Sequence, residues 1–245
     1  MRYSTVLLDV GETLIGPAVP FGVVYANVLA DHGLQLPPER LQAAIVDTMA
    51  WSMREIPPGI DRYGHFPGGE AEYWLRFSQR VLQHATGDEV DPQLAVRALD
   101  GLRNAFKLPT AWQVYPDVVP ALEALKAQGV QLGIVSNWDS RLNGVLEMLD
   151  LARHFAVIGV SHLEGFEKPD PELFRIVLRK LDADPASALH IGDVPELDGV
   201  GARAAGVDCL IVDRKDRLAD CGHPTIPDFT DLPRRAEHGY EIGAS

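Results

Sequence analysis

The stretch VLLDVGETL, residues 6–14, decides the fold of this chain. An apolar run leads directly into Asp9, and Gly11 follows shortly after it. A short apolar run that ends in a carboxylate and a glycine is typical of a buried strand whose carboxyl end carries a functional group. We therefore predict a central strand over residues 6–9, with Asp9 at its tip.

Further apolar runs downstream have the same character. They occupy residues 132–135, 156–160, 188–191 and 209–212. Segments with helical periodicity lie between or beside them, at residues 117–128, 140–149, 171–181 and 197–205. Strands that alternate with helices of this length favour a parallel sheet with helices on both faces. The predicted fold class is therefore α/β with a Rossmann-like core.

Residues 16–115 break this alternation. Helical patterns cover residues 21–32, 38–53, 70–84 and 92–105, and residues 56–69 are a loop rich in proline and glycine. We see no convincing strand in this segment. The sequence thus predicts a core made of residues 1–15 and 116–245, interrupted by a helical insertion that covers the tip of the first strand and excludes water from it.

Polar residues follow the predicted strands at the end where open parallel sheets bind ligands. These are Asp9, Ser136-Asn137, Asp193 and Asp213, and Lys168 stands just before a predicted helix. Each of them alone is more often a turn former, a cap or a surface residue. Together, carboxylates, a hydroxyl and a lysine at successive strand ends indicate a metal-assisted site for an anion.

The order of these motifs resembles the haloacid dehalogenase (HAD) superfamily. Residues 6–14 look like its first motif, an apolar strand followed by D-x-D-x-T, and IVSN at residues 134–137 looks like its second. Lys168-Pro169 is similar to the third motif, and GDVPELD at residues 192–198 is similar to the fourth, G-D-x-x-x-x-D. The helical insertion resembles the C1-type cap of this superfamily. The resemblance spans nearly the whole chain.

The resemblance implies a role for each of these residues. Asp9 would be the nucleophile that forms an aspartyl intermediate. Mg²⁺ would be held by Asp9, by the main-chain carbonyl of Gly11 and by Asp193. Ser136, Asn137 and Lys168 would bind the substrate, with Ser136 on the transferring phosphoryl group and Lys168 balancing negative charge. Asp198 would orient Lys168 or the metal shell, and Thr13 would shape the first loop.

The first motif departs from the family pattern at position 11. Phosphatases of the family carry an aspartate there that protonates the leaving group, and this chain has Gly11. General acid–base catalysis contributes roughly 10²–10⁴-fold, so we expect slow hydrolysis of alkyl phosphates and better hydrolysis of acyl or aryl phosphates. Glu12, and Asp61 or His65 in the proline- and glycine-rich loop, are weak candidates for a replacement acid.

Other functions of the family stay open at this point. Dehalogenases of the family also lack the second aspartate, and Arg40 or Arg54 could be proposed to hold a halide. Dehalogenases do not need magnesium, however, and their fourth motif lacks the G-D-x-x-x-x-D pattern that is intact here. Phosphonatases use a cap lysine, and residues 16–105 contain none. A catalytically weak module that binds a phosphorylated metabolite or a protein is the non-enzymatic alternative.

Composition agrees with an ordinary globular protein. The chain has 245 residues, 22 Lys and Arg against 35 Asp and Glu, and a formal net charge of −13. Such a charge disfavours nucleic acid and anionic membranes. The family resemblance, and not the charge, implies a small phosphorylated or halogenated metabolite as the partner. Two cysteines cannot form a disulfide framework, and no signal peptide or membrane span is recognisable. A cytoplasmic location is the simplest expectation.

Overall fold

The chain folds into two compact units in the computed structural model, which describes residues 1–87, 91–218 and 220–239. One unit comprises Met1–Gly16 and Val114–Ser245, and the other comprises Pro17–Gln113. The chain passes between them in a two-stranded sheet of β2 (Ile15–Pro17) and β3 (Trp112–Val114). These two short strands were not expected from the sequence.

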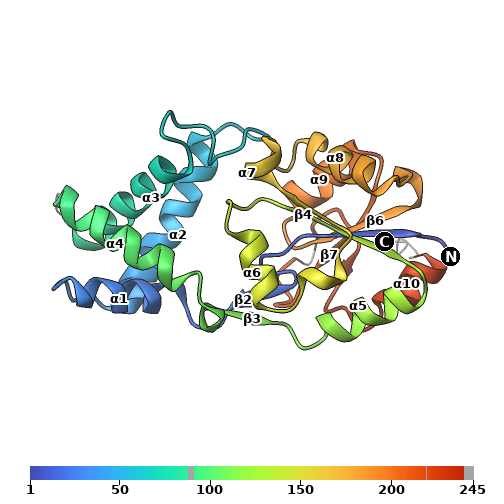
Figure 1. The fold of residues 1–245 in the computed structure, drawn as a ribbon, viewed down its shortest axis with the longest axis horizontal. Coiled ribbons are helices and arrows are strands. Elements are labelled where there is room, and N and C mark those ends of the chain that lie inside the picture. The colour runs from blue at the N-terminus through green and yellow to red at the C-terminus, as the bar shows by residue number, and fades with distance from the viewer. Residues whose placement is uncertain (88–90, 219, 240–245) are drawn as a thin grey trace. The chain divides into compact units, whose positions relative to one another are not determined.

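The first unit is built on a parallel sheet of six strands in the order β5-β4-β1-β6-β7-β8 (Figure 1). The strands are β1 (Thr5–Leu8), β4 (Gln131–Ser136), β5 (Val157–Val160), β6 (Ala188–Gly192), β7 (Asp208–Val212) and β8 (Thr225–Ile226). β1 is fully buried and lies between β4 and β6, with Leu7 paired to both Gly133 and His190. This confirms the predicted α/β fold class and places Asp9 at the centre of the sheet edge.

Helices cover both faces of this sheet (Figure 1). They are α5 (Val118–Ala127), α6 (Leu142–Met148), α7 (Ser161–Glu164), α8 (Pro171–Leu181), α9 (Val200–Ala204) and α10 (Leu232–His238), with short turns at Ala152–His154 and Pro185–Ser187. Phe174 and Val177 of α8 pack with Leu7 in a buried apolar cluster. The α8 helix begins where predicted, because the Asp170 carboxylate accepts the amide of Glu172 at 2.8 Å.

Two parts of the first unit differ from the prediction. The expected single helix over residues 197–205 is a π-helical turn, Pro195–Gly199, followed by the short α9. In that turn the Asp198 carboxylate accepts the amide of Val194 at 3.0 Å, which folds the side chain back toward the sheet. The segment after residue 213, whose sequence is polar, proline-rich and weakly patterned, supplies β8 and α10.

The second unit is helical and has an apolar core of its own. It contains α1 (Phe21–Asp31), α2 (Pro38–Glu55), α3 (Gly69–Thr86) and α4 (Pro92–Ala105), and a short turn at Pro109–Ala111 precedes β3. Tyr63 contacts Tyr73 edge to face at 4.9 Å between ring centroids, and Trp74 contacts Tyr73 at 5.1 Å. These aromatic residues of the insertion therefore pack against each other, as their type favours.

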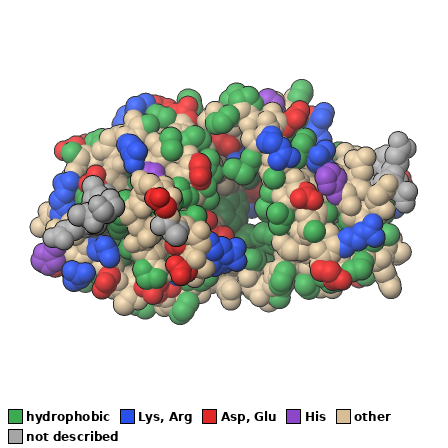
Figure 2. Space-filling view, turned by 180° about the vertical axis from the view of Figure 1, so that it is seen from behind, with side chains coloured by type: hydrophobic (Ala, Val, Ile, Leu, Met, Phe, Trp, Pro, Cys, Tyr) green, Lys and Arg blue, Asp and Glu red, His purple; other side chains and the backbone are tan. Residues whose placement is uncertain are grey.

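The space-filling view shows one face of the protein. On the face drawn in Figure 2, acidic and basic side chains are interspersed among apolar and polar ones. Among the residues drawn there in colour, no continuous basic stripe of the kind that nucleic acid requires is visible. In the part of the chain that the structure describes, no helix combines the length and the apolar character needed to cross a membrane.

Candidate active site

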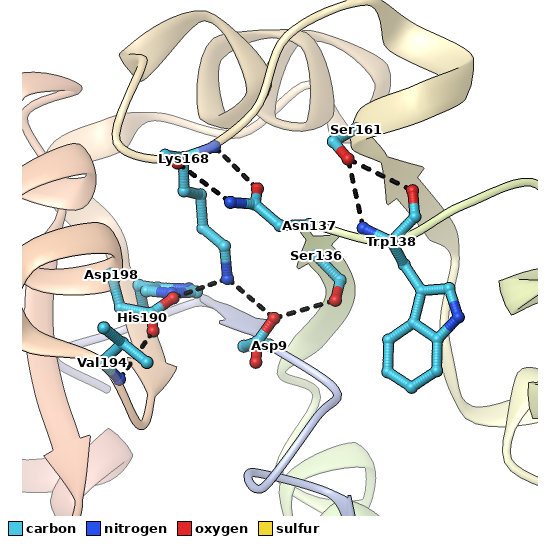
Figure 3. Close-up of polar contacts among 9 residues, drawn as sticks. All are labelled: Asp9, Ser136, Asn137, Trp138, Ser161, Lys168, His190, Val194 and Asp198. Carbon is cyan, nitrogen blue, oxygen red and sulfur yellow. Dashed lines mark hydrogen bonds and ion pairs between the residues drawn. The ribbon is translucent and has the colours of Figure 1, made fainter. Parts of the chain in front are cut away.

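Three residues from distant parts of the chain meet at the carboxyl end of β1. Lys168 Nζ donates to Asp9 Oδ1 at 2.7 Å, and Ser136 Oγ donates to the same oxygen at 2.9 Å (Figure 3). Asp9 follows β1, Ser136 ends β4, and Lys168 precedes α8 across a cis Lys168–Pro169 peptide. All three side chains are buried. The structure thus brings together the three predicted catalytic residues, with Asp9 Oδ2 carrying neither of these bonds.

Asp198 is the second anchor of the lysine. Its Oδ1 accepts Lys168 Nζ at 2.6 Å and lies 2.8 Å from His190 Nε2, while its Oδ2 accepts the Val194 amide. His190 sits on β6, has no exposed surface, and contacts the Phe174 ring edge to face at 4.8 Å. Both oxygens of Asp198 are therefore used within the protein, which supports an orienting function.

His190 is a member of this network that the sequence did not single out. It lies inside an apolar strand, where a buried histidine is indistinguishable from a packing residue. Its contact with Asp198 depends on the π-helical turn, which sequence periodicity does not predict. The one available signal was its position two residues before Gly192, the first glycine of the fourth motif.

The charges in this cluster stabilise one another. Burial alone would lower the pKa of Lys168, but the Asp198 and Asp9 carboxylates raise it above its ordinary value. Burial alone would raise the pKa of Asp198, but the Lys168 ammonium and the His190 bond hold it well below its ordinary value. Lys168 is therefore a permanent cation beside an ionised Asp198 at neutral pH.

Asp193 adds a further carboxylate and completes a group that could hold a metal ion. One oxygen each of Asp9, Asp193 and Asp198 lies within 4.8 Å of the others. Burial, and then the charges of Asp9 and Asp198, raise the pKa of Asp193 to about 8. Like charges at this spacing are costly unless a cation lies among them, so the donor set fits a divalent ion with a preference for oxygen.

Glycine at position 192 is required by the packing of this group. A Cβ atom there would lie 2.0 Å from the Asp198 Cγ atom, closer than any side chain tolerates. Glycine is therefore sterically required as the first residue of the fourth motif, because Gly192 leaves room for the carboxylate of Asp198, the last residue of that motif. Asp193 itself follows directly at the end of β6.

Asn137 is brought to the site but uses its amide on the main chain of Lys168. Its Nδ2 donates to the Lys168 carbonyl at 2.9 Å, and its Oδ1 accepts the Lys168 amide at 2.7 Å (Figure 3). This pair of bonds fixes the backbone from which the lysine side chain extends. The observed role is positioning, and direct binding of substrate by Asn137 stays a prediction.

The first loop places Gly11 beside the aromatic ring of Trp138. A Cβ atom on Gly11 would lie 3.4 Å from Trp138 Cζ3, so a side chain could begin there in ordinary van der Waals contact. Thr13 is fully buried in this loop, and its carbonyl accepts Arg214 Nη2 at 2.9 Å. The Arg214 guanidinium thus holds the main chain of this loop, and the shaping role implied for the Thr13 side chain stays a prediction.

Candidates for a replacement acid are engaged elsewhere. Glu12 Oε2 accepts Lys215 Nζ at 2.7 Å and the Tyr115 hydroxyl at 3.2 Å. Burial and the Glu12 charge raise the pKa of Tyr115 to about 12. The Asp61 carboxylate accepts main-chain amides of its own loop, and the His65 ring contacts Phe66 edge to face. These contacts give each candidate a structural function.

Asp213, which was also named from the sequence, is engaged in its own loop. The Asp213 carboxylate accepts the amides of residues 217 and 218 at 2.8 and 2.7 Å, so it caps its own loop. These bonds hold the pKa of Asp213 below its ordinary value. Arg40 and Arg54 are exposed residues of α2.

Comparison with known proteins agrees with this geometry. The family model for haloacid dehalogenase-like hydrolases matches residues 3–206, and the chain belongs to this family of hydrolases. It is 31% identical to haloacid dehalogenase-like hydrolase domain-containing protein 3 of Bos taurus, over 92% of this chain and 88% of that protein. It is also 31% identical to a phosphoserine phosphatase of Thermus thermophilus, over 87% of this chain and 90% of that protein.

Solved structures share the fold at lower identity. The HAD hydrolase YfnB of Bacillus subtilis, whose structure was solved with magnesium bound, superimposes with a TM-score of 0.75. The two chains are 22% identical, and the match covers 97% of this chain and 100% of YfnB. An L-2-haloacid dehalogenase of Xanthobacter autotrophicus matches with a TM-score of 0.68 at 18% identity. These likenesses establish the fold.

Proposed function

We propose that this hydrolase is a Mg²⁺-dependent phosphatase that acts on a small phosphorylated metabolite through an aspartyl-phosphate on Asp9. The observation that carries the proposal is the pairing of one Asp9 oxygen with both Lys168 and Ser136, at 2.7 and 2.9 Å. This arrangement fixes the carboxylate and leaves its second oxygen for attack. A phosphatase among the relatives supports the substrate class.

The reaction then takes place in two displacements at phosphorus. In the first, an Asp9 oxygen forms a bond to phosphorus while the ester bond breaks, and the leaving group departs with the electron pair. In the second, a water oxygen attacks the same phosphorus and the bond to Asp9 breaks. The free carboxylate is released with a phosphate that carries the protons of the water, one of which passes to solvent. Lys168 has a third N–H that would donate to the oxygens that carry the developing charge, and Ser136 would do so once its single proton turns away from Asp9 Oδ1.

The carboxylates suit a magnesium ion beside this reaction. Asp9 and Asp193 offer oxygen ligands, and the main-chain carbonyl of Gly11 is the third candidate. We assign Asp198 to the orientation of Lys168 and leave it as an additional candidate ligand, because both its oxygens already accept hydrogen bonds, from Lys168, His190 and the Val194 amide. When bound, Mg²⁺ would supply positive charge against the phosphoryl oxygens.

The absence of an acid at position 11 limits the leaving groups. Gly11 cannot donate a proton, and Glu12 is held by Lys215 and Tyr115. Esters whose leaving group is stable as an anion, such as aryl or acyl phosphates, do not need that proton. We therefore propose that hydrolysis slows steeply as the leaving group becomes more basic, by up to the roughly 10²–10⁴-fold that acid catalysis contributes.

A panel of aryl, acyl and alkyl phosphates, assayed with and without Mg²⁺, tests this function. Asp9→Asn is expected to abolish hydrolysis, whereas Asp47→Asn on the exposed side of α2 serves as the matched control. Activity that survives Asp9→Asn would refute the mechanism. Chloride release from 2-chloropropionate without metal would instead favour a dehalogenase. Binding of Mg²⁺ with no turnover of any ester would favour a binding module.

Gly11→Asp gives an independent test of the missing acid. The backbone of Gly11 accepts a Cβ atom at 3.4 Å from the Trp138 ring, so the substitution can be accommodated. We expect faster hydrolysis of alkyl phosphates, with a smaller effect on aryl phosphates. An unchanged or lower rate on alkyl phosphates would count against the proposed role of position 11.

A further inference from the structure

The turn that follows Asp9 is folded tightly by its own main chain. The Val10 carbonyl accepts the amides of Leu14 and Ile15 at 2.9 and 3.1 Å, and the Glu12 amide donates to the Ile15 carbonyl at 2.8 Å. Glu12 has a φ angle of 54°, a left-handed conformation that residues other than glycine seldom adopt. A turn of this kind persists only when the surrounding structure holds it.

Arg214, in the loop after β7, is a side chain that holds this turn from outside. Its Nη2 donates to the Thr13 carbonyl at 2.9 Å and to Asp117 Oδ2 at 3.0 Å, and its Nη1 donates to Asp117 Oδ1 at 2.9 Å. The guanidinium lies 4.0 Å from the centre of the Tyr115 ring and 5.3 Å from that of the Phe229 ring. The side chain is only 12% exposed. Two-point pairing with a carboxylate, together with contact to two rings, fixes the direction from which Arg214 meets the turn.

The hydrogen bonds of this turn leave the Gly11 carbonyl for another partner. The carbonyls of Val10 and Leu14 accept main-chain amides, and the Thr13 carbonyl accepts Arg214. Within the described ranges of the chain, no hydrogen bond uses the carbonyl of residue 11 or of residue 12. The main chain on both sides of these two carbonyls is therefore fixed, while the carbonyls themselves are not engaged.

We propose that Arg214 is a positioning residue for the metal site. By holding the Thr13 carbonyl, it keeps the main chain of the turn in one conformation, so that the Gly11 carbonyl is preorganised as a ligand. This inference rests on the proposed function, in which that carbonyl binds Mg²⁺. Arg214 is itself a cation, and its charge alone opposes the binding of a second cation nearby. A positioning role and a plain charge effect therefore predict opposite changes in Mg²⁺ affinity when Arg214 is removed.

Calorimetric titration of the metal-stripped protein with MgCl₂, without substrate, measures this affinity directly. We expect Arg214→Met to bind Mg²⁺ about 10- to 100-fold more weakly than the wild type, the effect typical of losing a partner that orients a metal ligand. Arg214→Lys keeps the charge and a donor but not the two-point pairing, so it should recover part of the affinity. If Arg214→Met does not fold, Arg214→Lys decides alone, since it should still bind Mg²⁺ more weakly than the wild type.

Two controls separate this role from charge and from stability. Lys215→Met removes the neighbouring cation, which pairs with the Glu12 side chain, and should not weaken Mg²⁺ binding. Phe229→Leu loosens the packing around the same guanidinium but keeps its bond to Thr13, so it should lower the melting temperature with little effect on Mg²⁺ affinity.

Several results would overturn the inference. They are unchanged or tighter Mg²⁺ binding by the folded Arg214 variants, equal weakening in Lys215→Met or Phe229→Leu, and no Mg²⁺ binding by the wild type. The ester panel is a separate assay, so the two proposals fail separately. Wild-type protein that binds Mg²⁺ but hydrolyses no ester would refute the phosphatase and leave the role of Arg214 standing.

Discussion

Replacing Lys168 by methionine tests how strongly the buried charges depend on one cation. Lys168 forms ion pairs of 2.7 Å with Asp9 and 2.6 Å with Asp198, and its side chain is only 2% exposed. Methionine keeps an unbranched apolar stem, so the packing loss is small. What remains is a set of buried carboxylates without their partner.

The magnitude follows from this burial. Removing one partner of a buried ion pair costs about 3–5 kcal/mol, because it leaves an uncompensated charge. In chains of this size each kcal/mol lowers the melting temperature by about 2–4 °C, so Lys168→Met should melt about 6–20 °C below the wild type. Mg²⁺ should restore part of this difference, since it compensates the same carboxylates.

The assay is thermal unfolding followed by circular dichroism, first with a chelator and then with Mg²⁺. Lys215→Met is the matched control, because Lys215 also lies 2.7 Å from a carboxylate, Glu12, but the two side chains are 51% and 39% exposed. An exposed pair contributes at most about 1 kcal/mol, so this variant should lose no more than about 4 °C. If the two variants melt together in the chelator, the reasoning on burial is wrong.

Three further substitutions probe the support of the site and of the sheet. His190→Leu removes a hydrogen bond to Asp198, so it should lower the free energy of unfolding by about 1–3 kcal/mol in urea titrations. In steady-state kinetics it should lower kcat more than it raises KM. His190→Gln keeps a donor and should recover part of the stability and part of kcat. Gly192→Ala should cost about 1–3 kcal/mol and most of the activity, because its Cβ meets Asp198, while Gly144→Ala on the exposed face of α6 should gain about 0.5–1 kcal/mol. Asp117→Asn should make the free energy of unfolding depend less on pH in acid. Burial raises the pKa of Asp117, but the Arg214 guanidinium and the Phe229 amide lower it below its ordinary value of 3.8. The wild type therefore loses this stabilising contribution only as the pH falls through that range. A variant whose stability still falls in parallel with the wild type below pH 4 would contradict the assignment.

The strands and the principal site residues could be predicted because their signals are local. An apolar run followed by Asp9, or a capped helix start after Lys168, is visible within a few residues of the chain. The parallel order of the sheet then forces their tips to one edge, so Asp9 and Lys168 meet although they are 159 positions apart. Periodicity and connection rules are sufficient for that step.

The parts that were missed depend on contacts without a local signal. β8 has only two residues, and it forms because its main chain pairs with the edge strand β7, where Val212 is paired to Ile226. His190 resembles any buried strand residue until the π-helical turn brings Asp198 to it. Asn137 was placed correctly at the site, but its bonds to the Lys168 main chain follow from a loop geometry that composition does not encode.

The two-stranded sheet of β2 and β3 makes the helical unit an exchangeable module. Its first and last segments lie side by side, and the Ala18 amide donates to the Ala111 carbonyl at 2.9 Å. An inserted segment of any length whose two ends pair as β2 and β3 do leaves the strand register of the six-stranded sheet unchanged. Diversification of substrate choice in such an architecture can therefore proceed by replacing a whole insertion, while the chemistry at the strand tips is inherited unchanged.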